Sequence, residues 1–207
     1  MGKISIRDFN DFEKKLGSLK ESQEWCEAIS YSPCHKYLAV GSHDNHVYIY
    51  ETTEDGKYKL YKDFIKHSSY VQAVDWALDS SYVRSASGDY EKLFFNITDK
   101  VHDPHGSSNT KGTVWATHTV KIGWDVMGIH PAGEDGTHIN GVNINSDNTL
   151  IATGDDFGLV NIFNYPVLNN EHKARSYAGH SEHVLRVVFS KDGNRLYSVG
   201  GQDETLI

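Results

Sequence analysis

The chain has 207 residues, of which 38% are hydrophobic and 12% aromatic, so it carries enough apolar side chains for a packed core. Its 20 basic and 28 acidic side chains leave a net charge of −8, without the basic excess that holds nucleic acid or anionic membranes non-specifically. No segment approaches the roughly 20 apolar residues of a membrane helix, and the N-terminus lacks a signal-peptide pattern. We therefore expect a cytoplasmic globular protein that binds neither nucleic acid nor membrane.

Four segments of the chain share a pattern of three short apolar runs separated by turns. The runs are rich in Val, Ile, Tyr and Phe and alternate or run continuously, which favours β-strands over helices. When Ala28, Ala73, Gly141 and Arg186 are aligned as equivalent positions, their spacings are 45, 68 and 45 residues. Two of these spacings fit the period of WD repeats, about 40–45 residues, and the third requires an insertion of about 23 residues. The sequence thus predicts an all-β fold, a WD-repeat β-propeller.

We expect residues 1–207 to form a partial propeller of about four blades, preceded by a fragment of another blade. The predicted parts are the end of a preceding blade (1–24), two blades (25–66 and 67–96), an insertion with strands (97–137), a further blade (138–179) and a truncated blade (180–207). Both ends would leave strand edges unpaired, which soluble β proteins normally close or cover. This pattern indicates a piece of a longer chain.

An aspartate follows the second predicted strand of every repeat. The four are Asp44, Asp89, Asp156 and Asp203. In WD repeats this carboxylate accepts a hydrogen bond from a histidine that precedes the first strand, and His67 and His180 stand at that offset in two repeats. Ser22 and Asp135 replace the histidine in the other two, where we expect the network to be incomplete. We interpret these residues as structural, because a charge-assisted hydrogen bond can lock a turn.

Three longer segments are more specific than the WD pattern. They read VWATHT (114–119), GIHPAGEDGTHINGV (128–142) and TGDDFGLV (153–160). In these segments the chain resembles the echinoderm microtubule-associated protein-like family, and the similarity extends over nearly the whole chain from Trp25 onward. The resemblance implies the later part of the second of two joined propellers, which together form a tubulin-binding body. It also implies a non-catalytic cytoskeletal role in binding tubulin or microtubules and organising them.

Other functions find little support in the sequence. It contains no Gly-x-Ser-x-Gly elbow, phosphate-binding loop or dinucleotide fingerprint, and we interpret Asp156-Phe157-Gly158 as a hairpin turn rather than part of a kinase. The histidine pairs at 43/46 and 102/105 lack an evident third ligand. We therefore expect no catalytic residue, cofactor or metal site. A generic scaffold that assembles other proteins remains the alternative to a tubulin-binding propeller.

Four residues of the insertion are candidates for contact with a partner: Trp115, Trp124, His130 and Asp135. Aromatic side chains dominate binding hot spots, but for the two tryptophans we favour filling the core beside an inserted strand. The polar segment 102–112 is rich in turn formers and predicts a mobile surface loop.

Overall fold

The computed structural model describes residues 2–53, 56–130 and 138–207. It divides into two compact units, Met1–Ala116 and Thr117–Ile207, which we describe separately. The first unit contains β1 (Ile4–Arg7), β2 (Lys15–Leu19), β3 (Cys26–Tyr31), β4 (Tyr37–Ser42), β5 (His46–Thr52), β6 (Tyr58–Ile65), β7 (Val71–Trp76), β8 (Tyr82–Ser87), β9 (Lys92–Asn96), β10 (Val101–His102) and the short helix α1 (Gly106–Asn109). The second contains the 3₁₀ turn η1 (Met127–Ile129), β11 (Ile139–Ile144), β12 (Leu150–Asp155), β13 (Leu159–Asn164), β14 (Arg175–Ala178), β15 (Val184–Phe189) and β16 (Leu196–Gly200).

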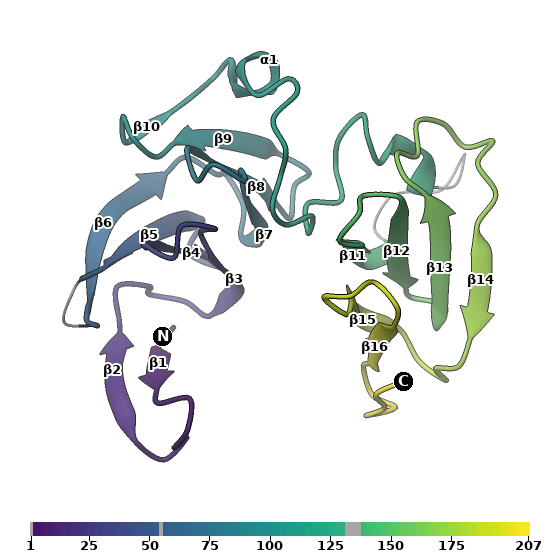
Figure 1. The fold of residues 1–207 in the computed structure, drawn as a ribbon, viewed down its shortest axis with the longest axis horizontal. Helices are drawn as coiled ribbons and strands as arrows, with labels where there is room; N and C mark the ends of the chain where they lie inside the picture. The colour runs from purple at the N-terminus through teal and green to yellow at the C-terminus, as the bar shows by residue number, and fades with distance from the viewer. Residues whose placement is uncertain (1, 54–55, 131–137) are drawn as a thin grey trace. The chain divides into compact units, whose positions relative to one another are not determined.

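Each complete repeat is one antiparallel sheet of four strands that pair in chain order. In the first unit these sheets are β3-β4-β5-β6 and β7-β8-β9-β10, and the hairpin β1-β2 precedes them (Figure 1). In the second unit the four-stranded sheet is β11-β12-β13-β14, and β15-β16 follows it as a pair. Four-stranded antiparallel sheets repeated along a chain are the blades of a β-propeller. The fold is therefore all-β and built of blades, as the sequence predicted.

The same β-bulge recurs in all four repeats, where the first strand meets the second. The register shifts fall at Cys26/Ala28, Val71/Ala73, Ile139/Gly141 and Val184/Arg186. The residue that follows each bulge is the one aligned in the sequence, so the 45, 68 and 45 residue spacings correspond to equivalent structural positions. A bulge inserts one residue and increases the local twist, which gives every blade the same bend at its inner strand.

The core of the first unit lies between its two four-stranded sheets. Val47, Ile49 and Phe64 of one sheet pack against residues of the other, among them Trp76 and Phe95. Trp76 is completely buried, and its indole Nε1 donates to the Ser30 carbonyl oxygen at 3.0 Å. A second cluster joins the β1-β2 hairpin to the first sheet through Leu19, Leu38, Val40, Tyr48 and Tyr50.

The insertion contributes to both units. The second sheet extends beyond residue 96, where the sequence placed its end, because β10 adds a fourth strand to it. Residues 106–109 form a helical turn rather than a loop, and the Asp103 carboxylate fixes it by accepting hydrogen bonds from Tyr82 and Asn109 at 3.0 and 2.8 Å. In the second unit, Val126 and Ile129 of the insertion pack against the apolar face of β11, β12 and β13.

Candidate protein-interaction site

The last repeat contains a buried histidine–aspartate pair. The Nδ1 atom of His180 lies 3.0 Å from Oδ2 of Asp203, and its Nε2 atom lies 2.8 Å from the Ser198 hydroxyl. The two side chains of the pair are only 1% and 4% exposed. Burial acts to raise the pKa of Asp203, but hydrogen bonds from Thr205 and His180 outweigh it and leave the pKa lowered. The carboxylate stays ionised and holds the turn between β16 and residue 205.

The second repeat makes the equivalent contact with a different carboxylate, so the expected pairing of His67 with Asp89 is wrong. His67 is buried and lies 3.0 Å through Nδ1 from Oε2 of Glu91, while its Nε2 atom contacts the Ser85 hydroxyl at 2.6 Å. Asp89 instead accepts hydrogen bonds from the hydroxyls of Ser68 and Ser87, which lower the pKa of its carboxyl group.

The first repeat replaces histidine with hydroxyl and amide donors. The Asp44 carboxylate accepts from the backbone N–H of Gln23 and from the Tyr48 hydroxyl, both at 2.8 Å. Ser22, at the histidine position, lies 2.6 Å from the Ser42 hydroxyl and 3.3 Å from Asp44. The network expected to be incomplete here is therefore built from other donors.

The third repeat holds its turn with an aspartate that stands earlier in the turn than in the other repeats. In the other repeats the aspartate directly precedes a residue with positive φ, but Asp156 stands two residues before Gly158, whose φ is 77°. The turn is held by Asp155, whose Oδ1 accepts from the backbone N–H groups of Phe157 and Leu159 at 2.9 Å each. Asp156 is 45% exposed and contacts Asn140 instead. Asp135 lies outside the described residues.

Trp115 of the insertion covers a buried ion pair. The indole ring lies 4.4 Å from the guanidinium carbon of Arg84, whose Nε donates to Asp75 at 3.1 Å. The Arg84 and Asp75 side chains are 5% and 0% exposed. A backbone bridge between Ala77 and Trp115 fixes the ring at the end of β7. Trp115 thus packs within the first unit.

Trp124 is 67% exposed, so the expectation that it fills the core is wrong. The two residues that follow it in the sequence are buried. Asp125 accepts a hydrogen bond from the Tyr165 hydroxyl at 2.8 Å, and Val126 packs on the sheet. His130 is partly buried, and its Nε2 atom donates to the Lys121 carbonyl oxygen at 3.0 Å. Trp124 remains a predicted partner contact, and His130 is held by backbone.

A stack of three rings was missed in the sequence. Its Trp25 is exposed, and His43 and Tyr70 are partly buried. The ring centroids of Trp25 and His43 are 3.9 Å apart, and those of His43 and Tyr70 are 4.5 Å apart. Trp25 is 62% exposed, although it is in direct ring contact with a neighbour. Every member lies just before a first strand or in a turn, where the expected strand pattern gives no information on side-chain stacking. We regard the Trp25–His43–Tyr70 stack as the best candidate for a partner-binding surface.

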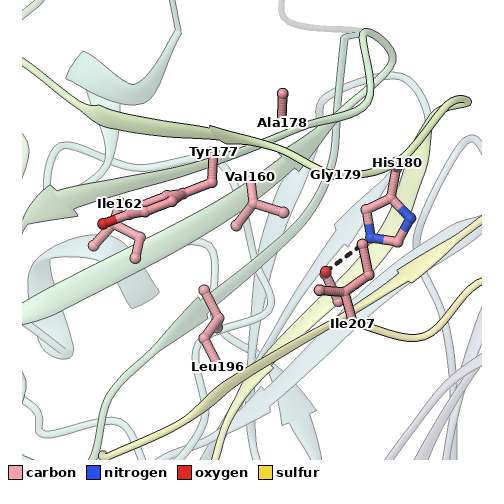
Figure 2. Close-up of a pocket in the computed structure, with 9 residues that line it drawn as sticks. Val160, Ile162, Tyr177, Ala178, Gly179, His180, Leu196 and Ile207 are labelled. Carbon is pink, nitrogen blue, oxygen red and sulfur yellow. Dashed lines mark hydrogen bonds between the residues drawn. The ribbon is translucent and has the colours of Figure 1, made fainter.

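The second unit contains an apolar groove of about 360 Å³. It is lined by Val160 and Ile162 of β13, Tyr177 of β14, Leu196 of β16 and Ile207, among others (Figure 2). In the first unit the corresponding space is filled by a third strand, because Phe95 of β9 stacks on Phe64 of β6 with ring centroids 4.4 Å apart. The repeat architecture accounts for the apolar lining of the groove, and we assign it no ligand.

The described part of the chain contains neither a candidate metal cluster nor a candidate membrane helix. Among residues 2–53, 56–130 and 138–207, no group of three or more His, Cys, Asp or Glu side chains could hold a metal ion. Within the same ranges, no helix is long and apolar enough to cross a membrane.

Comparison with known proteins decides the family. Residues 1–207 match the model of the second β-propeller of echinoderm microtubule-associated proteins. The chain belongs to the echinoderm microtubule-associated protein family. The expected assignment to the second propeller is thereby confirmed.

Relatives of this family cover the chain along its length. It is 42% identical over 207 residues to a ciliary WD repeat-containing protein of Euplotoides octocarinatus, over 100% of this chain and 28% of that protein. It is 42% identical over 184 residues to the 77 kDa echinoderm microtubule-associated protein of Lytechinus variegatus (88% and 28%), and 38% over 188 residues to human echinoderm microtubule-associated protein-like 4 (90% and 19%). The chain therefore spans less than a third of the length of these relatives.

A solved structure supports the fold alone. A chain of the mitotic checkpoint complex aligns with a TM-score of 0.56 and 18% identity, covering 99% of this chain and 55% of the other.

Proposed function

We propose that this chain is a non-catalytic, protein-binding part of a propeller that binds tubulin or microtubules and contributes to microtubule organisation in the cytoplasm. The observation that carries the proposal is the match of all 207 residues to a propeller of microtubule-associated proteins. The described residues support it, since the two clusters that join a carboxylate, an imidazole and a hydroxyl, at His180 and His67, have buried imidazoles and hold turns.

The second candidate is a scaffold that binds proteins other than tubulin. This chain covers only 28% or less of each of the three relatives compared above. This favours the second candidate, because another part of those proteins could bind the microtubule. A propeller segment of this kind would then assemble other partners.

Co-sedimentation separates the two candidates. The purified 207-residue chain is mixed with stabilised microtubules and centrifuged, and a parallel tube without microtubules measures self-pelleting. We expect the chain to pellet only with microtubules and to saturate with increasing polymer. A chain that stays in the supernatant at every polymer concentration contradicts tubulin binding by these residues. Affinity capture with purified tubulin dimers then shows whether binding requires the polymer.

A further inference from the structure

One position in every repeat carries an aromatic ring or an imidazole. This residue directly precedes the first strand. Its carbonyl oxygen accepts a hydrogen bond from a backbone N–H group in the turn after the second strand. The donor–acceptor distance is 2.9 Å in all four repeats, and the residues are Trp25, Tyr70, His138 and His183. The repeated backbone bond fixes where each side chain leaves the blade, so each ring is presented at the same edge of its own sheet.

In the first unit this edge is pre-organised. Tyr70 packs directly over Gly88, where an added Cβ would lie 2.4 Å from the tyrosine ring. At the equivalent turn position of the first repeat stands His43, whose imidazole fills the space between Trp25 and Tyr70. The His43 Nε2 atom lies 2.7 Å from Oε2 of Glu27, which holds the imidazole in place. Trp25 contacts the His43 ring and is still 62% exposed.

The surroundings of the stack are acidic. Within two residues on either side of Trp25, His43 and Tyr70, the sequence has three carboxylates and no lysine or arginine: Glu24, Glu27 and Asp44. Burial acts to raise the pKa of Asp44, but its hydrogen bonds outweigh burial and lower it, so this carboxylate is ionised at neutral pH. An exposed indole beside carboxylates attracts a cation, because the face of the ring is electron-rich.

The same unit already contains this combination in an occupied form. Arg84 lies against the Trp115 ring at 4.4 Å and donates to the Asp75 carboxylate at 3.1 Å. A planar guanidinium can stack on an indole and bond a carboxylate at once, which the compact ammonium of lysine does less well. Trp25 offers an indole that is 62% exposed, and two carboxylates flank it in the sequence, the exposed Glu24 and the 24% exposed Glu27.

We propose that the Trp25–His43–Tyr70 stack is a docking site for an arginine side chain of a partner protein, with the guanidinium on the exposed face of Trp25 and its N–H groups directed to Glu24 and Glu27. This inference rests on the proposed function in one respect, since it takes tubulin to be the protein that supplies the arginine. Arginine binding by the stack does not depend on which protein supplies the side chain, and it can be tested without tubulin.

The test uses the ¹⁵N-labelled 207-residue chain and the capped peptide acetyl-Gly-Arg-Gly-amide. The chain has four tryptophans, and the Trp25→Ala and Trp124→Ala variants identify two of the indole signals. We expect the arginine peptide to shift the Trp25 indole signal saturably. The neutral citrulline peptide, which keeps the planar shape, is expected to bind at least five-fold more weakly. Equal shifts with both peptides would overturn the role of the cation.

Variants locate the site. Trp25→Ala is expected to weaken peptide binding at least ten-fold, followed through backbone signals of His43 and Tyr70. Trp25→Phe keeps a ring with a weaker face and is expected to lose about two- to five-fold. Trp124 is a similarly exposed tryptophan of the other unit, and Trp124→Ala is expected to leave peptide binding unchanged. If Trp124→Ala abolishes the shifts and Trp25→Ala does not, the proposed site is wrong.

Microtubule co-sedimentation of the same variants separates this inference from the proposed function. If the unmodified chain and Trp25→Ala pellet equally well, tubulin binding stands and the arginine site is not its contact, which refutes the inference as stated. If the unmodified chain fails to pellet but binds the arginine peptide through Trp25, the site stands and the proposed function fails. We expect Trp25→Ala to pellet at least five-fold less tightly than Trp124→Ala.

Discussion

The indole of Trp115 lies 4.4 Å from the guanidinium carbon of Arg84, so a residue of the insertion covers a buried charge of strand β8. A desolvated cation–π contact contributes about 2 kcal/mol or more. We therefore expect Trp115→Ala to lower the free energy of unfolding by about 2 kcal/mol, measured by urea denaturation followed by circular dichroism. Trp124→Ala serves as the control and should change the free energy by less than about 0.5 kcal/mol, because its side chain is largely exposed. Equal effects would contradict the packing role of Trp115.

The Arg84–Asp75 pair should respond unequally to single and double substitution. Removing only Asp75, as in Asp75→Leu, leaves a buried guanidinium without its carboxylate and is expected to cost about 3–5 kcal/mol. The double variant Asp75→Leu/Arg84→Met removes both charges and should cost markedly less than the single one. The comparison again uses urea midpoints, and simply additive costs would show that the two residues do not interact energetically.

The third repeat offers a direct test of which aspartate holds its turn. Asp155 accepts two backbone hydrogen bonds at 2.9 Å, whereas Asp156 is 45% exposed. Hydrogen bonds to a charged group contribute about 1.5–3 kcal/mol, so Asp155→Ala should lower the free energy of unfolding by about 2 kcal/mol. Asp156→Ala should cost less than about 1 kcal/mol, since exposed pairs contribute little. A larger loss in Asp156→Ala would restore the sequence-based assignment of this position.

The course of the strands was predictable because its causes are local. Alternating apolar residues and turn formers such as Asp147 and Gly193 act within one hairpin, and the aligned anchors Ala28 and Ala73 both follow the repeated bulge. The turn aspartate of the third repeat was misplaced because Asp155 and Asp156 are adjacent and identical in type. Only backbone geometry distinguishes them.

The candidate site was less predictable because its contacts join distant residues. Trp115 and Arg84 are 31 positions apart, and Trp25 and Tyr70 are 45 apart with His43 between them. The 31-residue spacing matches no period of the chain. The 45-residue spacing is that of the repeat and marks Trp25 and Tyr70 as equivalent positions, but it does not reveal that His43 joins their rings. Similarly, His67 contacts the Glu91 carboxylate rather than that of Asp89, which accepts hydrogen bonds from the hydroxyls of Ser68 and Ser87.

Histidine burial predicts a loss of stability in mild acid. Burial lowers the pKa of His67 below the usual histidine value of about 6.5, although Glu91 acts in the opposite direction. The unfolded chain therefore binds a proton on this residue at a higher pH than the folded chain does, and the stabilising effect is complete above about pH 6.5 and lost progressively below it. We expect the free energy of unfolding to fall between about pH 6.5 and 5, and His67→Gln to show a shallower decrease. His172→Gln, at an exposed position, is the control, and an unchanged slope in His67→Gln would contradict this assignment.

Microtubule binding by this chain should depend only weakly on salt. The chain has a net charge of −8 and microtubule surfaces are also acidic, so attraction between opposite overall charges does not drive association. A local contact such as one arginine held by Trp25, Glu24 and Glu27 involves a single screened cation, and an exposed ion pair contributes about 0–1 kcal/mol, or at most about five-fold in affinity. Raising the salt from about 0.05 to 0.15 M should therefore weaken co-sedimentation by no more than about five-fold, measured as the apparent dissociation constant. A basic microtubule-binding tail, run as the control, should lose far more over the same range. A steep loss of affinity for this chain as well would mean that many charges take part in binding. That result would contradict binding through surface complementarity and a single ion pair.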